Sequence, residues 1–350
     1  MVVTFLEELC AVPAPSGAEG PLAERLAERW GTRCEDVRLD AVGNVVARVG
    51  GAGPRVLLQA HMDQVGYVVR HVTDDGFLLL DGAQGDRRMG PEHRHPVGQP
   101  VRVLTRGGDY LDGLLAAASG HVLTAKQREE SKLGYDDFWV ELGLGDRAAV
   151  LAAGVHVGAP VVFSGPVRRV GALLAGPAMD NRAGLALMDA LIGTEDLTCE
   201  LWLAATVQEE NGLHGARALT GRFDAAIALD VGLTGDIPAV DAREYATKLG
   251  GGPIAVHRDT GIIYDRALTQ HLLALARARG IPAQDGLFAS YGSDGLALAE
   301  SGSPTALLTV PTRYTHTAFE TIDPRDLDAA AALLRALVTS PQPPRRATAA

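Results

Sequence analysis

The alternation of apolar and polar positions divides the chain into three stretches. In the first, residues 4–30 carry an amphipathic helical pattern that a proline- and glycine-rich break divides in two. Ser16, followed three residues later by Glu19, matches a capping box for the second helix. Residues 45–49 and 56–60 are short β-rich runs separated by glycine and proline, which predicts a hairpin. The first stretch is therefore of the α/β type.

The pattern changes between about residues 66 and 167. Glycine and proline interrupt short apolar runs, and we expect one helix there, at residues 147–153. The predicted strands of this stretch cover residues 77–80, 100–104, 138–142 and 160–163. Short strands with frequent turns indicate a small β-rich domain, of the barrel type.

An α/β pattern returns after residue 168. We expect buried strands at residues 200–207, 225–229 and 305–310, and helices at residues 182–192, 265–279 and 324–338, the last opened by Asp323 and Pro324. The fold prediction is thus a mixed-sheet, three-layer α/β/α domain of residues 1–66 and 168–340. A β-rich insertion of residues 67–167 interrupts it, and residues 341–350 form a flexible C-terminal tail.

Composition and charge narrow the range of functions. The chain has 350 residues, 47% of them hydrophobic, which is enough for a large core. Its formal net charge of -11 argues against nucleic acid and against anionic membrane surfaces as partners. No apolar run is long enough to cross a bilayer, and the first residues lack the basic start of a signal peptide. Three scattered cysteines indicate free thiols in a reducing cytoplasm.

Potential metal ligands stand at the ends of several apolar runs. They are His61, Asp63, Asp180, Glu209, Glu210, Asp230 and His316. In an open α/β sheet the carboxyl ends of the strands share one edge, so these side chains are expected to meet there. Imidazole and carboxylate without thiolate suit zinc, cobalt or manganese. The set is too large for one three-ligand zinc and fits two metal ions that share a carboxylate, which predicts a metallohydrolase.

Two of the spacings carry specific chemistry. In the His61-x-Asp63 pair, residues two apart on an extended segment face the same way, so Asp63 can fix the tautomer of a ligating His61. Glu209 and Glu210 end a buried run, where unpaired acids are costly. One of them can bind metal while the other accepts a proton from water. Taken singly, each motif has an ordinary alternative, a chance pair or a solvated strand end.

Other conspicuous segments do not form a comparable pattern. The Glu92–His95 segment contains two histidines, but Pro91 and Pro96 flank it, and we expect a solvated loop. The glycine-rich residues 248–253 lack the ending of a phosphate-binding loop. No serine stands in a Gly-x-Ser-x-Gly context, which disfavours a serine hydrolase.

The chain resembles the tetrahedral-aminopeptidase (TET) family of dinuclear metallopeptidases, which includes glutamyl aminopeptidases and proteins labelled endoglucanase-like. The motifs that carry the resemblance run in order over nearly the whole chain. They are Pro-Ser-Gly-Ala-Glu at 15–19, Asp-Ala-Val-Gly-Asn at 40–44, Ala-His-Met-Asp-Gln-Val-Gly at 60–66, Asp-Asn-Arg-Ala-Gly at 180–184, Thr-Val-Gln-Glu-Glu-Asn-Gly-Leu at 206–213, Asp-Val at 230–231 and Arg-Tyr-Thr-His at 313–316.

The resemblance implies a ligand set for two divalent metal ions per subunit, zinc or cobalt first and manganese as a further option. Asp180 would bridge the two ions. His61 and Asp230 would complete one site, and Glu210 and His316 the other. The family usually has Asp-Asp-Arg where this chain has Asp-Asn-Arg at 180–182, but the first aspartate is the bridging one, so the ligand is retained.

The resemblance also implies a reaction and an assembly. Glu209 would be the general base and Asp63 would orient His61, in an aminopeptidase acting on peptides with a free N-terminus. The insertion would drive self-association into a hollow homo-oligomer, often a dodecamer. Two alternatives stay open: a related dinuclear deacylase of N-acyl amino acids, and a non-catalytic assembly protein on the same scaffold.

Overall fold

The computed structural model describes most of the chain. The described residues are 2–83, 97–119, 121–123, 134–238, 240–241 and 243–340. The expected loop at residues 92–95 and the expected tail at residues 341–350 lie outside them.

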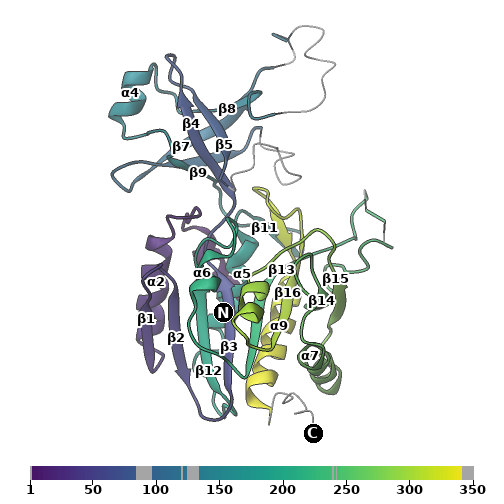
Figure 1. Ribbon diagram of the computed structural model, residues 1–350. Helices are drawn as coiled ribbons and strands as arrows, with labels where there is room; N and C mark the ends of the chain where they lie inside the picture. The colour runs from purple at the N-terminus through teal and green to yellow at the C-terminus, as the bar shows by residue number, and fades with distance from the viewer. Residues whose placement is uncertain are drawn as a thin grey trace.

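An eleven-stranded mixed sheet forms the centre of the larger part of the molecule (Figure 1). Its strands are β1 (Asp36–Leu39), β2 (Val45–Gly50), β3 (Arg55–His61), β10 (Arg168–Val170), β11 (Leu173–Gly176), β12 (Glu200–Thr206), β13 (Ala225–Leu233), β14 (Ile254–Arg258), β15 (Gln284–Leu287), β16 (Thr305–Arg313) and β17 (Glu320–Ile322). The order is β1-β2-β12-β3-β13-β16-β17-β11-β10, and β14 pairs with β15 and β16. The central strands β12, β3, β13 and β16 are parallel, so their carboxyl ends share one edge.

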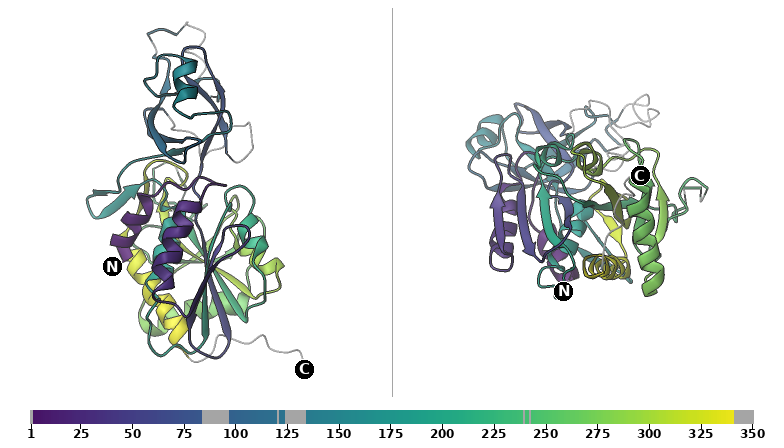
Figure 2. Two further views of the ribbon diagram at one scale, coloured as in Figure 1. Left: turned by 90° about the vertical axis from the view of Figure 1, so that its left-hand side faces the viewer. Right: turned by 60° about the horizontal axis from the view of Figure 1, so that its bottom comes forward.

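Helices cover both faces of this sheet (Figure 2). The helices whose apolar residues join the main core on one face are α1 (Val2–Cys10), α2 (Gly20–Gly31), α5 (Met179–Asp189), α7 (Arg266–Arg279) and α9 (Pro324–Thr339). The shorter α6 (His214–Ala218) and α8 (Gly295–Glu300) pack together on the other face. As predicted, Asp323 caps α9, because its carboxylate accepts the Arg325 N–H ahead of a helix that begins with proline. The predicted three-layer α/β/α fold is confirmed.

The insertion forms a closed antiparallel barrel above the sheet (Figure 1). Its strands are β4 (Gly66–Val72), β5 (Leu78–Gly82), β6 (Pro100–Leu104), β7 (Tyr110–Ala117), β8 (Phe138–Glu141) and β9 (Pro160–Phe163), and the one described helix is α4 (Arg147–Ala152). The barrel has its own core, in which the Tyr67 ring contacts the edges of Phe138 and Phe163 at centroid distances of 5.7 and 5.8 Å. The predicted β-rich insertion is therefore a six-stranded barrel.

Two local predictions were wrong. The runs that form β2 and β3 do not pair as a hairpin, because β12 lies between them, antiparallel to β2 and parallel to β3. Nor does Ser16 cap a helix, because α2 begins only at Gly20. The Ser16 hydroxyl instead donates to the Asp63 carboxylate at 2.6 Å. In both cases a partner distant in sequence replaces the local one that the pattern suggested.

The barrel enters and leaves the chain at the carboxyl edge of the sheet. β3 ends at His61 and β4 begins at Gly66, so only a short connection separates sheet from barrel. On the return, β9 leads into the β10–β11 hairpin, and α5 follows at Met179. The barrel stands over one end of the sheet (Figures 1 and 2).

The barrel core gives a stability test with a matched pair of leucines. Leu80 on β5 is fully buried, whereas Leu114 on β7 is 54% exposed. Leu80→Ala should lower the free energy of unfolding by about 2–5 kcal/mol, because it removes packed methyl groups and leaves a cavity. Leu114→Ala should change it by less than about 0.5 kcal/mol. Urea denaturation of both variants checks this, and equal effects would contradict the described packing.

Candidate metal centre

The carboxylate of Asp180 lies between two histidines that come from opposite ends of the chain. Its Oδ1 is 3.0 Å from His61 Nε2, and its Oδ2 is 3.4 Å from His316 Nε2. A second carboxylate accompanies each histidine, with Asp230 Oδ1 3.8 Å from His61 Nε2 and Glu210 Oε2 3.5 Å from His316 Nε2. Asp180 therefore faces two groups of donors, one with each oxygen.

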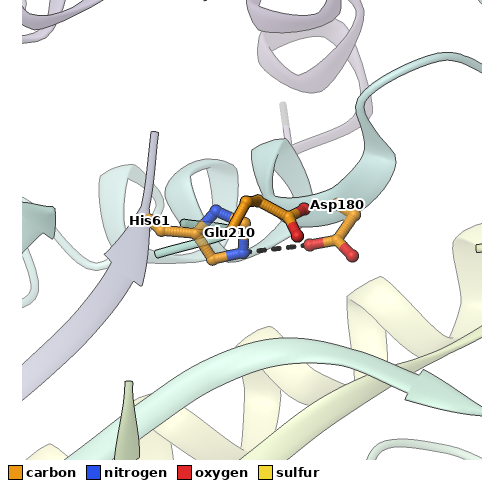
Figure 3. Close-up of side chains that lie close together, drawn as sticks. All are labelled: His61, Asp180 and Glu210. Carbon is orange, nitrogen blue, oxygen red and sulfur yellow. Dashed lines mark ion pairs between the residues drawn. The ribbon is translucent and has the colours of Figure 1, made fainter. Parts of the chain in front are cut away.

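These distances suit donor atoms that share a metal ion. Ligands about 2.0–2.1 Å from a tetrahedral zinc lie about 3.3 Å from one another. Ligand atoms of His61, Asp180 and Glu210 all lie within 4.8 Å of one another, and Figure 3 shows the three side chains converging. Within the described part of the chain, Glu210 Oε1 is buried and accepts no hydrogen bond. A buried orphan oxygen in a nitrogen and oxygen donor set fits divalent metal ions.

The orientation of His61 is fixed from its other ring nitrogen. His61 Nδ1 lies 3.2 Å from the Asp63 backbone oxygen and 3.4 Å from the Asp63 carboxylate, so oxygens of Asp63 accept the Nδ1 proton and Nε2 faces Asp180. Burial would lower the pKa of His61, but the acids Asp180, Asp230 and Asp63 raise it well above its usual range. This is the arrangement expected from the His61-x-Asp63 spacing.

Glu209 and Glu210 follow β12 and occupy different positions in the centre. Glu209 Oε2 lies 4.0 Å from His61 Nε2, whereas Glu210 lies beside His316. Burial raises the pKa of Glu209 well above its usual range, and burial raises the pKa of Glu210 to about 8. Two adjacent acids thus point to two sides of the Asp180 carboxylate.

Four consecutive backbone amides hold this acidic segment in place, and each donates to a side chain from a distant part of the chain. Val207 N donates to Asn44 Oδ1 at 3.0 Å, and Gln208 N donates to Glu19 Oε1 at 3.0 Å. The next two amides, of residues 209 and 210, donate to the two oxygens of Asp63 at 2.9 and 3.2 Å. Asp63 therefore supports both His61 and the acidic segment.

Glu320 plays the same part for the candidate ligands Asp180 and His316, although its position in the sequence does not mark it as a site residue. Its carboxylate accepts the Asp180 N–H at 3.0 Å and the His316 N–H at 2.7 Å, and its side chain is buried. Burial raises the pKa of Glu320 to about 8. In the sequence, Glu320 is only an acid four residues after His316 at the start of a short strand. Such acids are common in proteins, so the position alone does not indicate that Glu320 holds other site residues in place.

Backbone strain concentrates at the same place. Apart from Asp196, every described non-glycine residue with a positive φ lies next to or within the segments that carry the candidate ligands. These residues are Ala178, Gln208, Leu213, Tyr314 and His316. Such conformations cost free energy and persist only where surrounding bonds fix them. The amide-accepting side chains of Glu19 and Glu320 supply those bonds for Gln208 and His316.

The structure brings all seven predicted site residues to one edge of the sheet, with one change of position. Asp230 was expected just past a strand, but β13 continues to Leu233, so Asp230 lies within it. It still reaches the centre because β3 pairs with β13 only as far as Ala228. All of the predicted site residues except Asp63 also line a cavity of about 890 Å³, which gives a substrate access to them.

Comparison with known proteins places the chain in a family. A sequence profile of the M42 glutamyl aminopeptidase family matches residues 43–333. The chain belongs to the M42 family. It is therefore a metallopeptidase, a hydrolase with aminopeptidase activity on peptides. Among the described residues, no helix is long and apolar enough to cross a membrane.

Individual M42 relatives match over most of their length. The chain is 28% identical to the lysyl aminopeptidase of Pyrococcus furiosus, over 88% of each chain. It is similar in structure to an aminopeptidase of Desulfurococcus kamchatkensis, with a TM-score of 0.88, 28% identity and coverage of 97% and 94% of the two chains. It is also similar to the TET1 peptidase of Pyrococcus horikoshii, which can assemble into a tetrahedron or a large octahedral shell, with a TM-score of 0.81, 27% identity and coverage of 97% and 99%.

The metal-free M42 centre holds protons that an unfolded chain releases. Burial raises the pKa of Glu210 and of Glu320 from 4.5 to about 8. Although burial opposes it, Glu210 and Asp180 raise the pKa of His316 from 6.5 to about 10. At pH values between the ordinary and the raised pKa of these groups, the folded state binds more protons than the unfolded state. The free energy of unfolding of the metal-free protein therefore falls as pH rises.

Without metal, the free energy of unfolding should therefore decrease from about pH 5 to about pH 9. Added zinc should reverse the trend, because metal binding displaces these protons and strengthens with pH. Urea denaturation at several pH values, with chelator and with zinc, measures both slopes. Glu320→Gln serves as the control, since it removes one titrating group and should flatten the slope of the metal-free protein. A metal-free stability that rises over this range would contradict the assignment.

Proposed function

We propose that this M42 aminopeptidase removes N-terminal residues from peptides with two divalent metal ions per subunit, zinc or cobalt first and manganese as an alternative. The observation that carries the proposal is the Asp180 carboxylate, whose two oxygens face two different histidines at 3.0 and 3.4 Å. His61 and Asp230 would hold one ion with Asp180, and Glu210 and His316 the other. A carboxylate shared in this way is the usual bridge of a dinuclear hydrolase.

When bound, the two ions supply Lewis acidity, which polarises a peptide carbonyl and makes water easier to deprotonate. Glu209 accepts the proton of the attacking water and transfers it to the leaving amine. Glu209 Oε2 lies 4.0 Å from His61 Nε2, which is farther than the oxygens of the two carboxylates that would share an ion with this histidine. This position beside the ligands supports the role of a base. Asp63 keeps His61 oriented and holds the Glu209 amide.

The charge of the centre indicates where the free N-terminus of a peptide substrate would bind. The α-ammonium group of a peptide is attracted to the buried acids, so a substrate with an unblocked amine is favoured over an N-acylated one. The alternative deacylase would use the same ligands on a substrate without a free amine, so the choice of substrate decides between the two functions.

Glu209→Gln tests the role of the base. The variant should bind metal as the unchanged protein does but lose about 10²–10⁴-fold in kcat, because the amide cannot accept the proton. Hydrolysis of amino-acid anilides measures turnover, and metal content of the purified variant is the control. Near-normal turnover in the metal-loaded variant would show that another group is the base.

The same assay separates the aminopeptidase from the deacylase. Leucine anilide should be hydrolysed by the zinc- or cobalt-loaded protein, and N-acetyl-leucine should not. The reverse result would favour the deacylase, and no reaction with either compound would favour a non-catalytic assembly protein.

We further propose that residues 67–167 drive self-association into a large, hollow homo-oligomer, as a dodecamer. The TET1 peptidase of Pyrococcus horikoshii, which is similar in structure, can assemble into a tetrahedron or a large octahedral shell, and the similar PhTET1-12s structure contains a dodecamer. Light scattering of the purified protein should therefore give a mass near twelve times the 36.7 kDa chain. A monomeric or dimeric mass at micromolar concentration would contradict this assembly.

A further inference from the structure

The cavity above the metal centre has a neutral, apolar side that the proposed function does not yet use. Among the described residues that line it, every charged or titratable acid, base or imidazole belongs to the candidate centre. The remaining described lining residues are neutral, and Val231, Leu233, Tyr245 and Tyr291 are among them. The described lining thus offers a substrate side chain no charge outside the centre itself.

Aromatic and aliphatic side chains gather on this side. Leu233, Tyr245 and Tyr291 pack against one apolar cluster, which contains the buried ring of Phe288. The Phe288 ring centroid lies 6.2 Å from that of Tyr245 and 5.2 Å from that of Tyr291. The three half-buried side chains therefore present an apolar surface to the cavity, supported by the cluster from behind.

This surface adjoins the metal centre directly. The Tyr291 hydroxyl donates to the backbone oxygen of Val231 at 2.6 Å, and Val231 follows the candidate ligand Asp230 in β13. Leu233 lies two residues further along the same strand. A substrate whose α-amine and carbonyl are held at the acids and the metal ions has its first side chain within reach of these residues.

Two charged pairs lie close to the lining residues in the sequence. Asp236, which follows β13, pairs with Arg313 at 2.6 Å, and their opposite charges are held together. Asp241, close to Tyr245 in sequence, pairs in the same way with Arg243. Neither pair leaves a single charge available for the side chain of a substrate.

We propose that Leu233, Tyr245 and Tyr291 form a subsite for a bulky, apolar and uncharged N-terminal side chain, such as leucine or phenylalanine. This inference rests on the proposed aminopeptidase function and specifies its substrate class. Burying the apolar side chain is favourable, whereas a lysine or glutamate side chain would lose water without gaining a partner. The preference differs from that in the names of lysyl and glutamyl aminopeptidases of the family.

The test compares anilides of leucine, phenylalanine, lysine and glutamate with the metal-loaded full chain. The kcat/KM values for leucine and phenylalanine should exceed those for lysine and glutamate by about 100-fold, the size of discrimination expected of an apolar pocket. A preference for lysine or glutamate would overturn the subsite while leaving the aminopeptidase intact. No hydrolysis of any anilide would instead overturn the aminopeptidase function.

Substitutions assign the preference to residues. Leu233→Ala should lower kcat/KM for leucine anilide by about 10-fold or more and leave alanine anilide nearly unchanged, because only the larger side chain loses contacts. Leu287→Ala, at a 54% exposed leucine on β15 that does not line the cavity, is the matched control and should change neither. An equal loss for both anilides in Leu233→Ala would overturn the assignment of this residue.

Two further measurements fix the place of the subsite along the substrate. With the dipeptides Leu-Gly and Gly-Leu, Leu233→Ala should slow the first more than the second, and the opposite result would place the surface on the leaving side. Tyr245→Phe should keep the preference for leucine, because the ring remains, and Tyr245→Ala should weaken it. A Tyr245→Phe variant that lost the preference would show that the hydroxyl, not the apolar ring, selects the substrate.

Discussion

The structure depends on holding several buried carboxylates within a few ångströms of one another. Two like charges 4 Å apart repel by about 4 kcal/mol at the effective dielectric constant of a protein site, and each also loses its hydration. In the metal-free state, protons and two histidines offset this repulsion. Burial, with a further contribution from Asp180, raises the pKa values of Glu210 and Glu320 to about 8, so these groups hold protons. Divalent cations would offset the repulsion between these carboxylates more fully, so the acids at this edge of the sheet are best accommodated with bound cations.

Hydrogen bonds to backbone amides keep the acids together despite their repulsion. Asp63 and Glu320 each accept two amide N–H groups from the segments that carry other ligands, and Glu19 and Asn44 accept two more. Bonds from N–H donors stabilise a carboxylate in its charged form. These hydrogen bonds fix the backbone of the ligand-bearing segments. They also hold the acidic side chains in position and stabilise their negative charge.

The sequence predicts the ligands better than it predicts their supports. His61, Glu210 and His316 are recognisable because polar residues at the ends of apolar runs are unusual and because parallel strands gather such ends at one edge. Glu320 and Asn44 have no such signal, since their roles depend on contacts with residues far away in the chain. The hairpin expected between β2 and β3 was wrong for the same reason: the insertion of β12 is a long-range event that no local pattern records.

The insertion of the barrel between His61 and Asp180 has a consequence for how this architecture can vary. Both ends of the insertion are fixed at the candidate metal centre, one at the end of β3 and the other shortly before α5. The entropy lost by closing a long loop grows only slowly with its length, by about 0.6 kcal/mol for each doubling. Segments within the insertion can therefore lengthen, shorten or change sequence while the ligands keep their positions. The surface of the insertion, and the contacts that it makes with other copies of the chain, can therefore vary while the candidate metal centre stays the same.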